Sequence, residues 1–204
     1  ESQIPAQTIE QINRCYRGVL VMSYLVRKAL IDSGCQLPIA HIPMPLDDWR
    51  DDDLCLPVEI KPRNLLHVSS CFPRKGVDVL LRAFDVLAAR HSDLTLTIKT
   101  FPNPHNQCQN LIEQLLSPSH QQRVKLIEQD YSDEQMADLY RQASAVVLPS
   151  RGEGLNLPAI EACRYGVPVI STGYGAQTDF LADTQAELVN YHFSLSASHV
   201  SSRD

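Results

Sequence analysis

The segment that decides the fold is AVVLPSRGEGLNLPAIE, residues 145–161. It opens with an apolar run typical of a buried strand, and Asn156 followed by Pro158 is typical of the start of a helix. Glu153 lies in the glycine-rich turn before that start, and Glu161 lies about five residues into the helix, on the order of 7 Å from its first turn. The segment therefore predicts a strand, a turn and a helix that together carry two carboxylates.

The residue types around this helix start suit a ligand that joins an anion to hydroxyl groups. Glycines allow close approach of the backbone, the first N–H groups of a helix bind anions, and carboxylates accept hydrogen bonds from hydroxyls. A diphosphate held there would have one end near Glu153 and the other near Glu161. One of these carboxylates could then contact a sugar ring and the other a ribose. The alternative is that both are solvated surface glutamates, as single glutamates on helices usually are. Their combination in one short segment favours a sugar nucleotide.

The composition is that of an ordinary globular protein. The chain has 204 residues, of which 44% are hydrophobic, and a formal net charge of −6. This length suits one domain plus an appendage, and the negative charge argues against duplex nucleic acid as the main partner. The sequence has no apolar run of about 18 residues and no basic-then-apolar start, so it predicts neither a membrane span nor a secretory peptide.

Cysteines and histidines form no recognisable metal or redox motif. The six cysteines are scattered without a Cys-x-x-Cys pair, and the seven histidines include no pair at zinc-ligand spacing. We expect reduced thiols and no protein-bound metal.

Strands and helices are expected to alternate from Asn64 onward. Helical stripes of apolar residues occupy 77–88 and 136–143, and Ser132 with Gln135 predicts a capping box for the second. Strands are expected at 65–69, 94–99, 124–128, 145–149, 167–171 and 187–191. Alternation of helices with nearly continuous apolar strands predicts an α/β fold, a parallel sheet with helices on both faces.

The remaining segments suggest a piece of a larger protein. Because residue 1 is Glu rather than Met, we expect an excised fragment, with residues 1–45 as an α/β unit truncated at its front. Helices are expected there at 6–14 and 24–32, and strands at 18–23 and 38–43. The acidic, proline-punctuated stretch 46–63 predicts a linker or surface loop, in which Trp49 packs against a neighbouring domain. We expect a nucleotide-binding domain at 64–191 and a C-terminal tail at 192–204, where the start of a helix is left open.

Ligands of such sheets bind beyond the carboxyl ends of the strands. Arg74 and Lys75 follow the strand at 65–69 and directly precede a helix, where positive charge costs roughly 0.3–1 kcal/mol per residue unless an anion binds. The alternative is two solvated surface cations. The loop 173–179 either completes a phosphate cradle with its amides or is a turn between strands. Three further residues that follow strands could contact a base, with core packing of the aromatics as the alternative: Phe101, Asn103 and Tyr131. We expect His105 to be a loop residue without a catalytic role.

A set of motifs then resembles the group 1 retaining glycosyltransferases over roughly residues 64–191. The motifs, in the order and spacing of that family, are Arg74-Lys75-Gly76, residues 132–136 leading to Leu139-Tyr140, residues 149–154, residues 158–162 and residues 166–170. Residues 18–45 are similar to that family's passage out of its N-terminal domain. The resemblance implies a GT-B fold of two Rossmann-like domains, of which this chain is the C-terminal, donor-binding one.

The resemblance also implies roles for single residues. Glu153 would contact the donor-sugar hydroxyls, Glu161 the ribose hydroxyls, and Lys75 the diphosphate, with help from Arg74. Backbone amides around Gly154, Leu155 and Asn156 would assist.

The chain departs from the family pattern at two positions. Ser70 stands where the family has an arginine that pairs with the lysine on the diphosphate, and whether Arg74 replaces that arginine is left open. Asn156 replaces the usual glycine and alters how closely a sugar approaches, which leaves the donor open.

The implied activity is retaining, metal-independent transfer of a hexose from a nucleotide diphosphate to an acceptor glycan or glycolipid. It needs no cofactor beyond the donor substrate, and it implies a cytoplasmic place in polysaccharide assembly, with a peripheral position at the inner membrane face left open. Because the acceptor-binding domain is nearly absent, we expect little or no transfer by this chain alone. Two alternatives remain, a non-catalytic nucleotide-binding or interaction module, which Ser70 favours, and a sugar-nucleotide epimerase or a phosphorylase.

Overall fold

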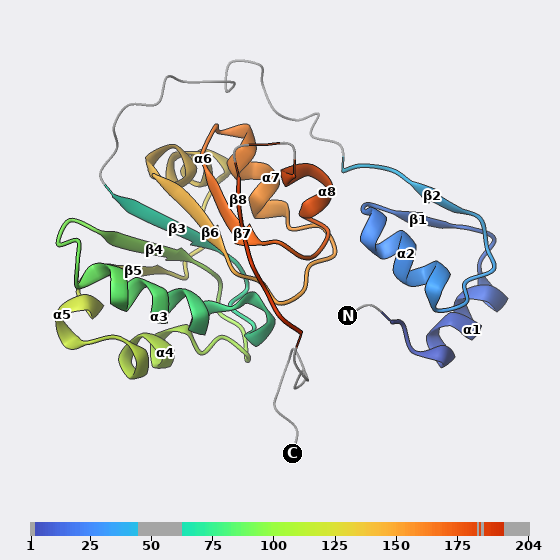
Figure 1. Cartoon of the computed structure of the whole chain (residues 1–204), viewed down its shortest axis with the longest axis horizontal. Helices are drawn as coiled ribbons and strands as arrows, with labels where there is room; N and C mark the ends of the chain where they lie inside the picture. Colours follow the sequence, from blue (N-terminus) through green and yellow to red (C-terminus); the bar gives the residue numbers. More distant parts are fainter. Residues whose placement is uncertain (1–2, 45–62, 183, 185, 194–204) are drawn as a thin grey trace.

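The computed structural model describes residues 3–44, 63–182, 184 and 186–193 (Figure 1). Most of the expected linker 46–63, with Trp49, and most of the tail 192–204 lie outside these residues. Within them the chain forms a two-stranded parallel sheet near the N-terminus and a six-stranded parallel sheet in the remainder.

The N-terminal unit has the expected order of helix, strand, helix and strand. Its elements are α1 (Ala6–Cys15), β1 (Val19–Val21), α2 (Tyr24–Asp32) and β2 (Ile39–His41). Both strands are shorter than predicted. The hydroxyl of Ser23 accepts a hydrogen bond from the Val26 N–H and so caps α2. Ile9, Val21 and Leu30 form a small core between the sheet and the helices.

The larger sheet has the strand order β5-β4-β3-β6-β7-β8, and all neighbouring strands pair in parallel. Its strands are β3 (Asn64–Val68), β4 (Thr95–Lys99), β5 (Val124–Ile127), β6 (Ala145–Leu148), β7 (Val169–Thr172) and β8 (Glu187–Val189). Each predicted strand is present, with ends that differ by one or two residues. The order moves outward from β3 in one direction and from β6 in the other, which places a topological switch point between these two strands.

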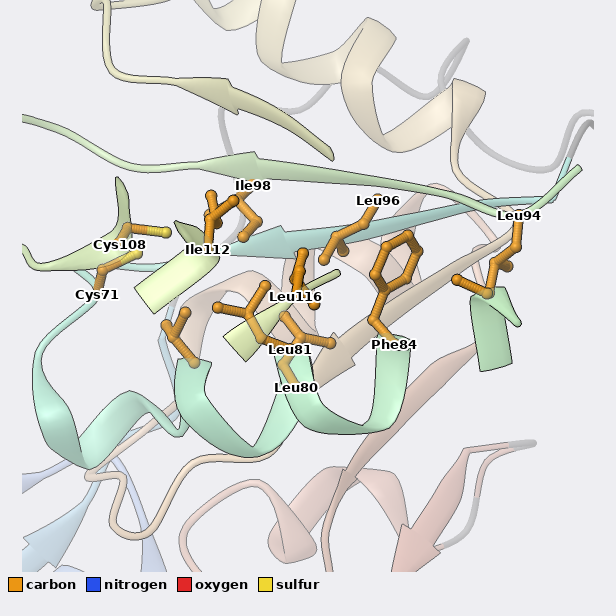
Figure 2. Packing of buried hydrophobic residues seen from close by; sticks show 12 residues of the cluster. Cys71, Leu80, Leu81, Phe84, Leu94, Leu96, Ile98, Cys108, Ile112 and Leu116 are labelled. Atoms are coloured by element: carbon orange, nitrogen blue, oxygen red, sulfur yellow. The ribbon is translucent and has the colours of Figure 1, made fainter. Parts of the chain in front are cut away.

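Helices cover both faces of this sheet. They are η2 (Pro73–Lys75), α3 (Val77–Ala88), α4 (Cys108–Leu115), α5 (Pro118–Gln121), α6 (Asp133–Gln142), α7 (Leu157–Arg164) and α8 (Thr178–Leu181). Leu81 and Phe84 of α3 pack with Ile112 of α4 against Leu96 and Ile98 of β4 (Figure 2). A second core cluster lies among α6, α7 and α8, and includes Leu66 of β3 and Leu148 of β6.

The predicted parallel α/β fold is therefore confirmed as a Rossmann-like sheet covered on both faces. The predicted capping box is also confirmed, because Ser132 accepts from the Gln135 N–H while the Gln135 side chain accepts from the Ser132 N–H. In the described part of the chain no helix combines the length and the apolar character that a bilayer span needs.

The N-terminal unit contacts the larger domain through the start of α2. The Tyr24 N–H donates to Asp179 Oδ2 at 2.7 Å. The Val26 side chain lies beside Gly154, because a Cβ added to Gly154 would lie 3.9 Å from Val26 Cγ2. Asp179 therefore satisfies a first-turn N–H of α2 and fixes this unit beside the turn after β6.

Candidate functional site

The loops that follow β3 and β6 touch at Gly76. Its φ of 71° lies in the left-handed region, and a Cβ added to it would lie 2.1 Å from the carbonyl oxygen of Pro149. Only glycine fits this approach without displacing backbone. The contact brings Arg74 and Lys75, which directly precede Gly76, beside the turn that carries Glu153.

A bidentate ion pair ties the same two loops together. The Arg151 guanidinium donates to both oxygens of Asp78 at 2.9 and 2.7 Å, and the Arg151 backbone N–H donates to the Arg74 carbonyl at 2.7 Å. Hydrogen bonds from Arg151 lower the pKa of Asp78 below its usual value. The sequence did not predict this pair, because Asp78 and Arg151 meet only through the strand order.

Glu153 and the two predicted cations form one cluster. Lys75 Nζ lies 2.6 Å from Glu153 Oε1, and Arg74 Nη1 lies 3.3 Å from Glu153 Oε2 and 2.9 Å from the Gly152 carbonyl. The side chains of Glu153 and Lys75 are only 6% and 12% exposed. In this structure Glu153 is thus a buried carboxylate that compensates two cations.

A cavity of about 380 Å³ opens beside this cluster, at the carboxyl ends of β3 and β4 and the start of α7. Its volume lies in the range of small-molecule sites, roughly 300–1,000 Å³. Four of the predicted site residues line it: Ser70, Arg74, Lys75 and Glu161. The structure therefore brings the lysine and the second glutamate of the prediction to one cavity.

Glu161 is held by a buried tyrosine. The Tyr140 hydroxyl donates to Glu161 Oε2, and Tyr140 itself is 1% exposed. Burial raises the pKa of Glu161 above its usual value, and the hydrogen bond from Tyr140 opposes this. The carboxylate is oriented by one donor and keeps capacity to accept more hydrogen bonds.

The other predicted binding residues do not line the cavity. Gly154, Leu155 and Asn156 lie in the turn before α7, outside the residues that line the cavity. Asn156 has a φ of 70°, and its buried Nδ2 has no hydrogen-bond partner within the described structure. The role of the amides in this turn stays a prediction.

The loop 173–179 is fixed mainly by its own hydrogen bonds. Gln177 Nε2 donates to the carbonyls of Thr172 and Tyr174 at 3.0 and 2.7 Å. The Ala176 N–H donates to the Glu153 carbonyl at 3.3 Å, so the loop contacts the backbone of the turn that carries this glutamate. A role of its amides in a phosphate cradle stays a prediction.

Of the candidate strand-end residues after β4 and β5, only Phe101 is among the residues that line the cavity. The Asn103 side chain donates to the Ser70 carbonyl at 3.0 Å. The Tyr131 ring centroid lies 5.5 Å from the ammonium of Lys99, a lining residue that the sequence reasoning missed. His105, expected to be a plain loop residue, packs edge-on against Phe72.

His67 is a second residue that sequence reasoning missed. It lies on β3 with no exposed surface, and its ring nitrogens are 2.7 Å from the Val147 carbonyl oxygen and 2.8 Å from Ser69 Oγ. Burial lowers the pKa of His67 to about 4, so the ring is neutral at pH 7. It links β3 to β6 directly beneath the loop that carries Lys75.

Acidic, histidine and cysteine side chains do not gather in threes at metal-binding distance anywhere in the described residues. The ionisable groups that face the cavity are lysine, arginine and glutamate. They are suited to binding an anion and hydroxyl groups.

Comparison with known proteins identifies the family. Residues 57–193 match the model of the family described as "Glycosyl transferases group 1". An MMP alpha-(1->4)-mannosyltransferase of Mycolicibacterium hassiacum is 32% identical over 128 residues, which are 62% of this chain and 30% of that protein. A D-inositol 3-phosphate glycosyltransferase 1 of Catenulispora acidiphila is 35% identical over 127 residues, 58% of this chain and 30% of that protein.

Solved structures share the fold at low identity. Anabaena Alr3699/HepE in complex with UDP-glucose has a TM-score of 0.71 at 18% identity, covering 91% of this chain and 53% of that one. The sucrose-phosphate synthase of Thermosynechococcus elongatus has a TM-score of 0.69 at 23% identity, covering 91% and 48%. The present chain spans about half of these structures and less than a third of the curated relatives named above. The chain belongs to the group 1 glycosyltransferase family.

Proposed function

We propose that this chain is the donor-binding part of a retaining hexosyltransferase. It would bind a nucleotide-diphosphate sugar, from which the intact protein transfers the hexose to an acceptor glycan or glycolipid. The observation that carries the proposal is the Lys75–Glu153 ion pair at the edge of a cavity that Glu161 also lines. A structural neighbour in complex with UDP-glucose and relatives named as mannosyltransferases support the same ligand class.

The diphosphate would bind at Lys75, Arg74 and the first turn of α7. Departure of the nucleoside diphosphate concentrates negative charge on the phosphate oxygens, and fixed cations and helix N–H groups stabilise that charge as it develops. The amides around Gly154, Leu155 and Asn156 would contribute from the turn. In this scheme Lys75 stabilises the leaving group without a metal ion.

The two glutamates would recognise the two ends of the donor. Glu161 would accept hydrogen bonds from the ribose, in an orientation fixed by Tyr140. Glu153 would accept hydrogen bonds from the hexose hydroxyls once the diphosphate has taken over part of its ion pairing with Lys75. Fixing both ends of the donor holds the anomeric carbon toward the acceptor.

The organisation of the intact protein follows from the same proposal. Residues 1–45 would be the remnant of an N-terminal domain, residues 46–63 a linker, and residues 64–191 the C-terminal half of a GT-B fold. Without the acceptor-binding domain, water surrounds the donor and weakens each charge interaction, so this chain alone would transfer little or no hexose. We place the intact enzyme in the cytoplasm, or peripherally at the inner face of the membrane, in polysaccharide assembly.

Ser70 favours one second candidate, a nucleotide-binding module that has lost transfer. It lines the cavity with a hydroxyl at the position where the family resemblance implies a cation. The two candidates differ in the intact protein, since only the enzyme releases nucleoside diphosphate in the presence of both donor and acceptor.

The proposal is tested by a thermal-shift panel of nucleosides, nucleoside diphosphates and nucleotide sugars. Ligand stabilisation follows RT ln(1 + [L]/Kd), so a ligand at about 100 times its Kd adds about 2.7 kcal/mol. We expect at least one nucleoside diphosphate and its sugar derivative to raise the midpoint, and the nucleoside to raise it much less. Absence of any shift across the whole panel contradicts donor binding.

A further inference from the structure

Lys99 is a buried cation that has no carboxylate partner in the part of the chain that the structure describes. It is the last residue of β4, it is 7% exposed, and its Nζ donates to the Thr100 carbonyl at 2.7 Å. The ammonium also lies 5.5 Å from the centroid of the Tyr131 ring. None of the ion pairs among the described residues includes it. Because lysine is rarely buried unless it is paired, the fold bears a desolvation cost here that a bound anion would offset.

The hydroxyl of Thr100 is a second buried polar group beside the Lys99 ammonium. Thr100 Oγ1 is buried and has no nitrogen or oxygen partner within the described structure, and it lies close enough to the Cys71 thiol to help lower the pKa of that group. Lys99 and Thr100 both line the cavity that Lys75 and Glu161 line. An ammonium and a hydroxyl are both donors, so the neighbouring pair suits a ligand atom that accepts hydrogen bonds.

The charge balance of the cavity gives Lys99 a specific role. Lys75 and Arg74 are both paired with Glu153, and Glu161 adds a second carboxyl group. Two cations and two ionised carboxylates sum to zero, so these four side chains leave no net positive charge to attract a diphosphate. Lys99 is the charge that makes the site positive.

We propose that Lys99 is a third cation of the donor site and binds an anionic oxygen of the diphosphate. This inference rests on the proposed function and adds to it a binding residue from β4. Lys99 pairs in register with Val68, two residues before Ser70, so it approaches the cavity from the strand next to the position where Ser70 supplies only a hydroxyl. The competing role for a buried ammonium is donation to a carbonyl of the base, and the test separates the two.

The test compares three probes by isothermal titration calorimetry: inorganic pyrophosphate, the tightest of the uridine, guanosine and adenosine diphosphates, and the matching nucleoside. The variants are Lys99→Met, Lys99→Gln, which keeps a donor for the Thr100 carbonyl, and Lys99→Arg, which keeps the charge. Lys125→Met removes an exposed lysine of the neighbouring strand β5 and serves as the charge-matched control.

We expect the methionine and glutamine variants to bind pyrophosphate and the nucleoside diphosphate about 10-fold or more weakly, as for the loss of one charge-assisted hydrogen bond. Nucleoside binding, the arginine variant and the Lys125→Met control should stay within about 3-fold of wild type. Unchanged diphosphate binding overturns the inference. An equal loss for nucleoside and diphosphate also overturns it, because it assigns Lys99 to the base or to the fold.

Thermal unfolding without ligand separates binding from folding. Removing a buried charge that has no ion pair should leave the midpoint of Lys99→Met equal to or above that of wild type. A lower midpoint together with uniform loss for all probes indicates a structural lysine and rejects the inference. If wild type binds pyrophosphate through Lys99 without preferring any nucleoside diphosphate, the proposed function fails and the Lys99 anion site stands. If wild type binds neither pyrophosphate nor a nucleoside diphosphate, the proposed function and the Lys99 site both fail.

Discussion

Lys75 and Glu153 form an ion pair in which Nζ lies 2.6 Å from Oε1, although 78 positions separate them in sequence. The pair joins the loop after β3 to the turn after β6, and Arg74 adds a second cation to the same carboxylate. Glu153 therefore competes with any anion that approaches these cations. Under the proposed function, a diphosphate that binds Lys75 would release acceptor capacity on Glu153, and a sugar attached to that diphosphate would bring the hydroxyls that use it.

Replacing Glu153 by Gln should change the affinities of nucleotide and nucleotide sugar in opposite directions. The free nucleoside diphosphate should bind more tightly, because the competing carboxylate is gone. The nucleotide sugar should lose part of its advantage over the nucleotide, because an amide is a weaker acceptor for hexose hydroxyls than a carboxylate. Calorimetric titration of both ligands measures the two changes.

The same variant should destabilise the ligand-free chain by about 3 kcal/mol, since two cations lose a largely buried partner. Glu10→Gln, at an exposed position of α1, is the matched control and should change neither affinity nor stability. A nucleotide affinity that falls in Glu153→Gln would count against competition between Glu153 and the diphosphate.

Nucleotide affinity should depend on pH through Glu161. Burial raises the pKa of this carboxyl group above its usual value, and a protonated carboxyl accepts fewer hydrogen bonds from ribose hydroxyls. Affinity should therefore fall as the pH drops through the raised pKa. As the pH rises, Glu161 keeps its proton to a higher pH in the folded chain than in the unfolded chain. Its contribution to the free energy of unfolding is therefore present at low pH and is lost as the pH rises through the pKa of the folded state.

Glu161→Gln should remove both effects, and comparison with wild type between pH 4 and 8 isolates them from other titrating groups. Denaturant unfolding measures how the free energy of unfolding depends on pH, and titration with a nucleoside diphosphate measures how the affinity depends on pH. Identical pH profiles in the two proteins would refute a role for this carboxylate.

Alanine should destabilise the chain more at Gly76, where the added Cβ meets backbone, than at Gly166, where it meets nothing. Gly76→Ala forces a Cβ to within 2.1 Å of the Pro149 carbonyl oxygen, which should cost about 3 kcal/mol or more and displace Lys75. Gly166→Ala is the control, because its φ of 63° is similar and no atom lies within 4 Å of the added Cβ. The control should lose only about 1–2 kcal/mol and keep its nucleotide affinity. Equal losses in the two variants would rule out a specific contact at Pro149.

Buried His67 should make the fold sensitive to mild acid. Because its pKa is about 4 in the folded chain and 6.5 in the unfolded one, the unfolded chain takes up a proton first as the pH falls. The contribution of neutral His67 to the free energy of unfolding is complete above about pH 6.5. It is lost as the pH falls toward 4, a change of about 3 kcal/mol. Urea unfolding of wild type and His67→Gln over this range should give curves that converge at low pH. Parallel curves would show that another group is responsible.

The sequence predicted the strands and the sheet because their cause is local. Apolar runs separated by amphipathic helices specify a parallel sheet, and the rule on carboxyl ends then brings Lys75 and Glu161 to one edge. The capping box of α6 was also predictable, since Ser132 and Gln135 are close in sequence.

The missed residues depend on contacts between distant segments. Lys99 resembles any lysine at a strand end until the register beside β3 buries it. His67 is kept neutral by its burial in the sheet, against the opposing effect of its hydrogen bond with the Val147 carbonyl. Asp179 was a candidate for the phosphate loop, and only its distance to Tyr24 assigns it to the start of α2. The sequence holds the residues of these contacts but not the strand order that creates them.

The central claim is that the cavity beside Lys75 binds the diphosphate of a nucleotide. Its most direct test is calorimetric titration of wild type and Lys75→Ala with the nucleoside diphosphate that gives the largest thermal shift. We expect measurable binding by wild type and a loss of about 10-fold or more in the variant, with both proteins folded by circular dichroism. Equal affinity of the two proteins would contradict it.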